Sequence, residues 1–288
     1  MERVWQELEE HLKEYIIPSL MTLFQTMFGY VNDEVSGIAS DVAMTPSAFS
    51  PSVFGMVRNV SENVIMPIAG IILTFVACYE LIQLIISYNN LANFETWFIF
   101  KWIFKTAIAV EIITHTFDFA MAVFDVANHV ISSAGGVIAA STAIDSSALS
   151  SLQSTLEAMN IFELFGLYFQ VSIIFITTLI LSKIIFVIIY VRMIEIYMYV
   201  SMAPIPFATF GNREQSAMGM NYVKSLFALG FQGFLIMICV GIYAVLIQSI
   251  AFSGDIVGSL WGVVGYTLLL ALSLFKTSTV AKSVLQCI

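Results

Sequence analysis

The chain has 288 residues, of which 59% are hydrophobic and 11% charged, and its mean hydropathy is +0.91. A soluble domain is roughly half apolar and one quarter charged, so this composition excludes a soluble protein and indicates an integral membrane protein. The net charge of −9 excludes a free-standing nucleic-acid-binding domain, because phosphate contacts require clustered Lys and Arg.

Residues 1–66 are predicted to form an external amphipathic helix followed by a linker. Apolar residues recur at helical spacing near the start of the chain, namely Trp5, Leu8, Leu12 and Tyr15. The polar face of this helix is acidic, whereas a helix that binds anionic lipid has a basic face. We therefore expect it to dock on a partner or on the chain's own membrane domain. Residues 29–61 are rich in Ser, Asp, Gly and Pro and are predicted to be irregular.

Residues 67–288 are predicted to form an all-α, polytopic transmembrane domain. Five apolar segments are long enough to span a bilayer: residues 67–88, 101–124, 164–190, 224–252 and 256–275. Residues 97–134 contain neither glycine nor proline, so one long helix is expected to include the second span. Residues 132–163 form a loop without Lys or Arg.

The apolar sequence after the third span is interrupted by Pro204 and Pro206. Each proline removes a backbone donor and disfavours a helical conformation in the residue before it, so the helix is expected to break there. A polar turn follows, composed of Gly211, Asn212, Arg213 and Glu214. Residues 193–223 are therefore predicted to form a re-entrant or interfacial hairpin.

This region resembles a known family. Residues 202–208 read Met-Ala-Pro-Ile-Pro-Phe-Ala, and residues 222–226, Tyr-Val-Lys-Ser-Leu, lead to Phe231, Gln232 and Gly233. Together with the charged turn, they resemble the TrbL-like polytopic inner-membrane subunits of type IV secretion and conjugation machines. In the rest of the chain, only the order of spans and loops resembles the family. The acidic amino-terminal segment does not resemble it.

The positions of Lys and Arg predict the orientation of the chain. They cluster after the first span, between the third and fourth spans, and after the fifth. If these clusters are cytoplasmic, the amino terminus lies outside and five spans place the carboxy terminus inside. The external residues 1–66 then carry three basic and nine acidic residues. This layout also resembles that of the TrbL-like family, which implies the inner membrane of a bacterium.

Several charged residues fall within the predicted spans. Glu111, His115, Asp118, Asp125 and His129 are spaced so that all five lie on one face of the second span. Because charge at bilayer depth is costly, such residues normally face a cavity or a partner. Pairing within the bundle or at a subunit interface is the leading interpretation, and a proton or cation path or a metal site are alternatives.

Other residues are predicted to form an ion pair, to let two helices pack closely, or to form a basic surface at the cytoplasmic side. Glu80 is a candidate partner for Lys183, which alternatively extends to the cytoplasmic interface. Gly258 and Gly262 form a G-x-x-x-G arrangement that lets another helix approach closely. A closed homo-oligomer would repeat a cytoplasmic basic collar around its axis. The collar is predicted to consist of Lys183, Arg192, Arg213 and Lys224.

No catalytic pattern, phosphate-binding glycine loop or zinc signature is present, so we expect neither an enzyme nor a cofactor. The resemblance implies a channel or scaffold subunit that assists transfer of single-stranded DNA and bound protein across the cytoplasmic membrane. It also implies secretion ATPases and bitopic scaffold proteins as partners, besides membrane lipids. The alternatives are a small-solute or ion transporter, which should show repeats and breaks in both halves, and a non-conducting membrane scaffold.

Overall fold

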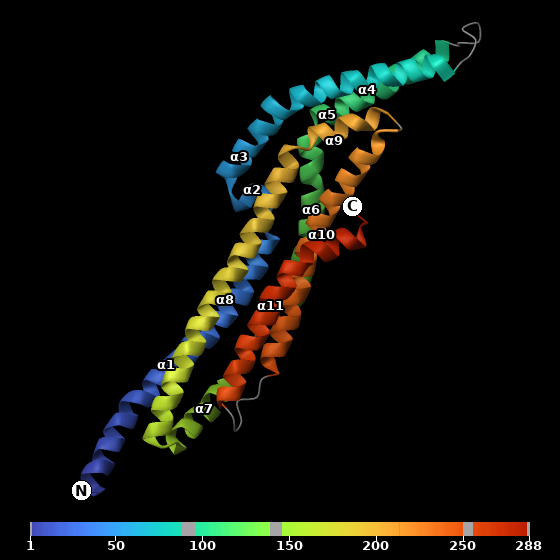
Figure 1. Cartoon of the computed structure of the whole chain (residues 1–288). Helices are drawn as coiled ribbons and strands as arrows, with labels where there is room; N and C mark the ends of the chain where they lie inside the picture. The colour runs from blue at the N-terminus through green and yellow to red at the C-terminus, as the bar shows by residue number, and fades with distance from the viewer. Residues whose placement is uncertain (1, 88–95, 139–145, 213, 250–255, 287–288) are drawn as a thin grey trace. The chain divides into compact units, whose positions relative to one another are not determined.

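The computed structural model describes residues 2–87, 96–138, 146–212, 214–249 and 256–286. These residues are almost entirely helical and include no strand, which confirms the predicted all-α fold (Figure 1). The helices are α1 (Glu2–Ala43), α2 (Pro46–Phe49), α3 (Pro51–Val60), the π-helix η1 (Ser61–Ile65), α4 (Met66–Ser87), α5 (Thr96–Thr114), α6 (Thr116–Ile138), α7 (Ser146–Ala158), α8 (Ile161–Ser201), α9 (Pro204–Ala208), the 3₁₀-helix η4 (Thr209–Gly211), α10 (Ser216–Gln248) and α11 (Ile256–Val284).

The helices account for the predicted number of membrane spans. Four segments are long and apolar enough to cross a membrane, namely Pro51–Ile86, Ile161–Gly211, Ser216–Gln248 and Ile256–Val284. The pair α5 and α6 has the same character but is bent by 65°, and it provides the fifth span if it crosses as one. Large apolar side chains are exposed on these helices, for example Phe75 and Phe104, as expected where lipid replaces water.

The chain divides into two compact units. The first contains Met1–Ala43, Ser132–Ile189 and Leu235–Thr277, and the second contains Met44–Ile131, Tyr190–Phe234 and Ser278–Ile288. Because α6, α8, α10 and α11 cross these boundaries, each contributes residues to both units.

In the first unit, α1 packs against the chain's own helices. Leu20, Phe24 and Met27 are buried in one core with residues of α7, α8 and α11. Docking on the chain's own membrane helices was one of the two expected outcomes, but the contact does not use the predicted stripe, since the Tyr15 side chain is 82% exposed. The apolar residues that follow Tyr15 provide the contact.

The predicted irregular linker over residues 29–61 is wrong. Helix α1 continues to Ala43, and α2 and α3 follow it with prolines in their first turns. Ile38 and Val42 are buried, so burial of one helix face outweighs the weak helix preference of the Gly and Ser residues in this stretch. The prolines are compatible with helix because the first turn needs no intrahelical donor.

The second unit contains two apolar clusters. One joins α3, α6, the end of α8 and the start of α10, and it includes Phe117, Tyr197 and Leu229. The other joins α4, α5 and α9 and includes Leu73, Ile113 and Ala208. The short helix α9 is thus part of the core of this unit.

Candidate functional site

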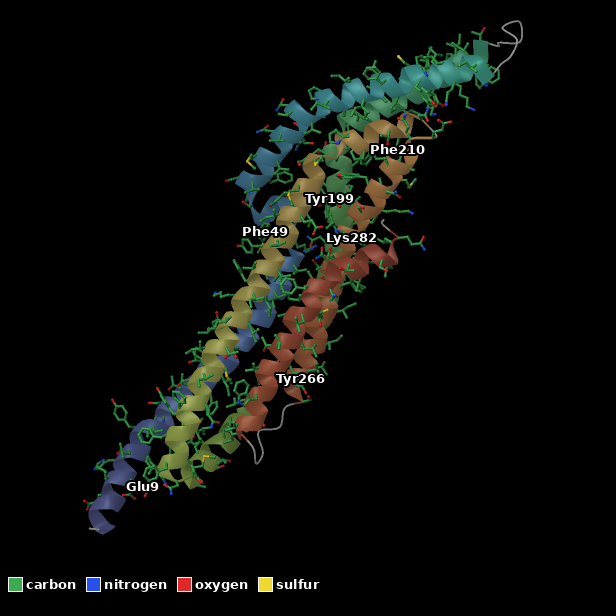
Figure 2. All side chains as sticks on the ribbon, in the orientation of Figure 1. Glu9, Phe49, Tyr199, Phe210, Tyr266 and Lys282 are labelled. Carbon is green, nitrogen blue, oxygen red and sulfur yellow. The ribbon has the colours of Figure 1, made fainter. Side chains whose placement is uncertain are left out.

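The chain reverses between α8 and α10 in the second unit. Helix α8 continues to Ser201, so the predicted start of the hairpin at residue 193 is wrong. The prolines fall in the short helix α9, and η4 and an extended Asn212 precede α10. Figure 2 labels Tyr199, near the end of α8, and Phe210, in η4. The amides of Met202 and Ala203 bond to carbonyl oxygens three residues back, at 3.2 Å each, which tightens the last turn. Ala203 itself remains helical, with φ −51° and ψ −40°, so the expected loss of helical geometry before Pro204 is wrong. The interruption arises from missing donors in the first turn of α9.

Small residues let the reversal pack closely on its neighbours. Ala208 of α9 is buried against Ala69 of α4 and Ala109 of α5. At Gly219 of α10, an added Cβ would lie 2.8 Å from the carbonyl oxygen of Pro206 and 3.0 Å from the ring of Phe210. The start of α10 therefore rests directly on the reversal, and a side chain at Gly219 would push the two apart.

Polar contacts fix the reversal at both ends. The hydroxyl of Thr209 donates to the carbonyl of Pro206 at 2.7 Å and accepts from the Gly219 amide at 3.2 Å. On the α4 side, the Asn212 side-chain amide donates to Gln83 at 3.5 Å, and the Tyr79 hydroxyl donates to Glu214 at 3.4 Å. The turn thus contacts α4 through polar as well as apolar side chains.

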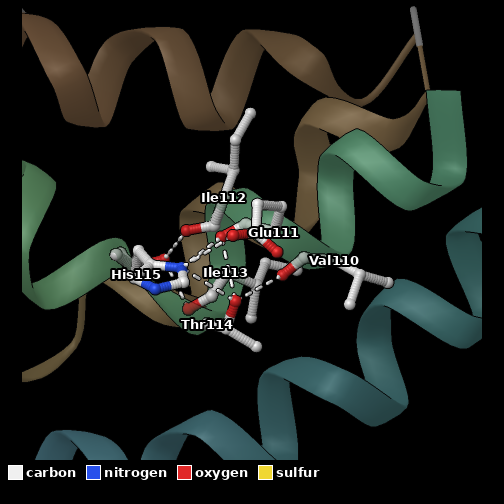
Figure 3. Close-up of polar contacts among 7 residues, drawn as sticks. Val110, Glu111, Ile112, Ile113, Thr114 and His115 are labelled. Carbon is white, nitrogen blue, oxygen red and sulfur yellow. Dashed lines mark hydrogen bonds and ion pairs between the residues drawn. The ribbon is translucent and has the colours of Figure 1, made fainter. Parts of the chain in front are cut away.

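A second interruption lies at His115, where one long helix over residues 97–134 was expected. That expectation is wrong, because the chain bends by 65° between α5 and α6 without a proline or glycine. Figure 3 shows the side chains of Thr114 and His115 turned back to the preceding turn. The Thr114 hydroxyl donates to Val110 and Glu111 carbonyls at 3.1 and 2.9 Å.

Thr116 contributes to the same bend from a fully buried position. Its hydroxyl donates to the carbonyls of Ile112 and Ile113, at 2.8 and 2.9 Å. Side-chain bonds of this kind compete with the backbone ladder and bend helices. Because of the bend, Glu111 and Asp118 lie on two helices whose axes differ in direction. The five polar residues therefore do not form one straight stripe.

Two of the charged residues predicted at bilayer depth, Glu80 and Asp118, are paired within the chain. The amine of Lys105 donates to Glu80 at 2.6 Å, joining α5 to α4. Glu80 thus pairs with Lys105 and not with its predicted partner Lys183, whose side chain is exposed. Asp118 accepts from Arg58 at 3.3 Å, and Arg58 also donates to Glu62 at 2.7 Å.

The remaining members of the predicted stripe lie at the surface. Glu111 and His115 approach within 3.4 Å, but both side chains are more than half exposed. Asp125 and His129 are also exposed on α6. The described residues include no group of three potential metal ligands.

The four residues of the predicted basic collar have different surroundings. Lys183 is exposed and Lys224 is half-buried, while Arg213 lies outside the described residues. Arg192 is only 4% exposed and lies against Gly233 of α10. An exposed collar therefore cannot include Arg192 in this conformation. The missing side chain at Gly233 creates the space that the guanidinium occupies.

One ion pair of the second unit had no signal in the sequence. The amine of Lys282, at the end of α11, donates to Glu195 of α8 at 2.9 Å. The residues are 87 positions apart, and neither belongs to a motif. The glycines proposed for helix packing, Gly258 and Gly262, are exposed and half-buried, so their contact with another helix stays a prediction.

Comparison with known proteins places this arrangement in a family. The family described as TrbL/VirB6 plasmid conjugal transfer like protein matches residues 31–204, more than half of the chain. The chain belongs to the TrbL/VirB6-like family. Together with its candidate spans, this makes it a multi-pass membrane protein related to conjugal transfer.

The TrbL/VirB6-like match includes the bend at His115 and stops at Pro204, where the reversal begins. The motifs at residues 202–233 that resemble the family lie almost entirely after the matched range. The predicted family is nevertheless confirmed. No curated protein and no solved structure matches the chain significantly.

Proposed function

We propose that this protein is an inner-membrane channel subunit of a conjugative type IV secretion system. It assists the passage of single-stranded DNA and bound protein across the cytoplasmic membrane. The observation that carries the proposal is the match to a plasmid conjugal transfer family over more than half of the chain. The several apolar helices support a role in the membrane part of such a machine.

The reversal is the part of the subunit that we assign to the cytoplasmic mouth. It carries the polar turn and precedes Lys224, and positive residues favour the cytoplasmic side. Repeated by a homo-oligomer, Arg213 and Lys224 would attract a polyanion. Energy for transfer would come from partner ATPases, since the sequence contains no phosphate-binding glycine loop.

The function is tested by deleting the gene from a conjugative donor strain and measuring plasmid transfer. We expect transfer to be lost and to return with the wild-type gene. Formaldehyde cross-linking during mating should then recover the transferring strand with this subunit. Normal transfer by the deletion strain would contradict the proposal.

A non-conducting scaffold is the second candidate. It is supported by the ion pairs of Glu80 and Asp118, which are satisfied within the chain instead of facing a substrate path. A scaffold is needed for transfer but does not cross-link to DNA. Replacing Arg213 and Lys224 by glutamine separates the two functions, because only a basic collar requires their charge. Unchanged transfer at unchanged abundance would favour the scaffold.

The proposed orientation is tested by labelling introduced cysteines with a membrane-impermeant thiol reagent. Cysteine in place of Gln6 or Ser141 should react in intact cells, whereas cysteine in place of the exposed Gln215 should not. Reaction at Gln215 from outside would exclude a cytoplasmic reversal.

A further inference from the structure

Arg192 is a buried cation whose charge is not compensated by the described residues. Among the described residues, the Nε and Nη1 atoms of Arg192 have no hydrogen-bond partner. No ion pair between described residues includes Arg192. A guanidinium stays protonated in proteins, and burying it without an acceptor is costly. The packed arrangement is therefore incomplete at this residue, and an anionic group would complete it.

The guanidinium lies at a seam between α6 and α10 where helices meet at glycine. A Cβ on Gly233 would lie 2.5 Å from Nη2 of Arg192 and even closer to Cδ1 of Ile131. One turn away, a Cβ on Gly230 would lie 2.9 Å from that of Ala127. Because α10 has no side chain at Gly230 or Gly233, none has to be withdrawn there when the two helices separate, and separation would give an anion access to Arg192.

The outer side of the seam is an apolar groove. It is lined from α6 by Val126, Ala127 and Val130, and from α10 by Gly230, Phe231 and Phe234. Val126, Val130 and Phe231 are exposed, in a chain whose helices are suited to a bilayer. These walls suit an acyl chain, whereas a soluble anion has no polar group to approach along them.

We propose that Arg192 binds the phosphate of an anionic phospholipid when the α6/α10 seam parts, with an acyl chain in the adjoining groove. The guanidinium provides charge-assisted hydrogen bonds to phosphate oxygens, the strong form of this contact. Because the lipid binds only the parted seam, it stabilises that state by mass action. The site is independent of the proposed transfer function.

The wild-type protein in detergent provides the first test, with phosphatidylglycerol, dioleoylglycerol and inorganic phosphate as probes. Phosphatidylglycerol should bind at least about tenfold more tightly than dioleoylglycerol, which lacks the phosphate. Equal binding of these two lipids would overturn the proposal. Saturation by inorganic phosphate alone, or preference for a single-stranded oligonucleotide, would also overturn it, since neither occupies the groove.

Variants assign the binding to Arg192 and to the seam. Arg192→Gln should lose the preference for phosphatidylglycerol, and Arg192→Lys should keep part of it. Arg58→Gln is the matched control, because Arg58 is paired with Glu62 and Asp118, and it should bind as the wild type does. An unchanged preference in Arg192→Gln would overturn the proposal.

A reversible lock tests the opening itself and does not depend on how the Arg192 variants fold. In a background without the native cysteines, Ala127→Cys and Gly230→Cys place two thiols across the seam. The oxidised protein should lose phosphatidylglycerol binding, and reduction should restore it. Binding that is the same before and after reduction would show that the seam does not open for the lipid.

Discussion

The second unit interrupts its helices in two different ways. After α8, the interruption coincides with Pro204, and the missing donors act whatever the surroundings. Between α5 and α6 there is no proline, and the 65° bend coincides with hydroxyl bonds from Thr114 and Thr116 to earlier carbonyls. The first interruption is a property of the backbone, whereas the second depends on side chains and on packing. The two should therefore differ in how easily substitutions change them.

The two interruptions also pack together. Ile113, just before the bend, shares a core with Ala208 of α9, and Phe117, just after it, shares another with Ala203. Helix α5 thus packs against α9, and α6 packs against the end of α8 and the residues just after it. The bend at His115 therefore lies between two buried contacts with the segment around the proline interruption.

The largest effect on stability is expected where α10 meets the reversal. Gly219→Ala should destabilise the fold by about 1–3 kcal/mol, because the new Cβ would meet the backbone of Pro206. Gly70→Ala in α4 is the matched control, since nothing lies within 4 Å of its added Cβ, and it should be neutral or slightly stabilising. Thermal unfolding in detergent measures both. Equal melting temperatures for the two variants would show that the start of α10 does not rest on the reversal.

A smaller effect is expected at the bend. Replacing Thr114 and Thr116 by valine removes the hydroxyl bonds and should cost about 0.5–1.5 kcal/mol for each bond lost. The bend should also open, which spin labels at the exposed Phe100 and Val126 would detect as a longer distance. Thr74→Val removes a comparable 2.8 Å bond from the unbent α4 and should change no distance. If the label distance is the same in both cases, packing alone sets the bend.

The smallest effects concern two ion pairs that involve α5, the helix before the bend. Lys105 and Glu80 are partly buried, so a double-mutant cycle should give a coupling of roughly 0.2–1 kcal/mol. Glu111 and His115 are more exposed and should show no measurable coupling. A stronger coupling for the second pair would mean that it is buried by a partner in the assembly.

The sequence predicted the features whose causes lie within a few residues of one another. It did not predict features that depend on contacts between distant segments. Apolar length identified the spans, and Pro204 identified the reversal, because both signals act within a few residues. Hydroxyl bonds like those of Thr114 and Thr116 also occur at Thr74 in α4 and Thr178 in α8 without a bend like that between α5 and α6, so the local sequence did not predict it. Similarly, burial of Ile38 and Val42 keeps α1 helical through a stretch whose composition is typical of a loop.

The charged residues show the same limit for the candidate site. Membrane depth explains why Glu80 needs a partner, but the choice of Lys105 over Lys183 depends on α4 lying against α5. The rule that places Arg and Lys on the cytoplasmic side says nothing about burial, so Arg192 was expected in an exposed collar. Its burial depends on Gly233, which lies 41 positions away in the sequence.

Plasmid transfer by a Pro204→Ala/Pro206→Ala variant tests most directly whether this conjugal-transfer subunit depends on its reversal. Hydrophobicity is little changed, so membrane insertion and abundance should be preserved, while a continuing helix would displace η4 and the polar turn. Transfer should fall toward the level of the deletion strain. Pro67→Ala, at an exposed position in the first turn of α4, should transfer as the wild type does. Wild-type transfer by the double variant at equal abundance would contradict the central claim.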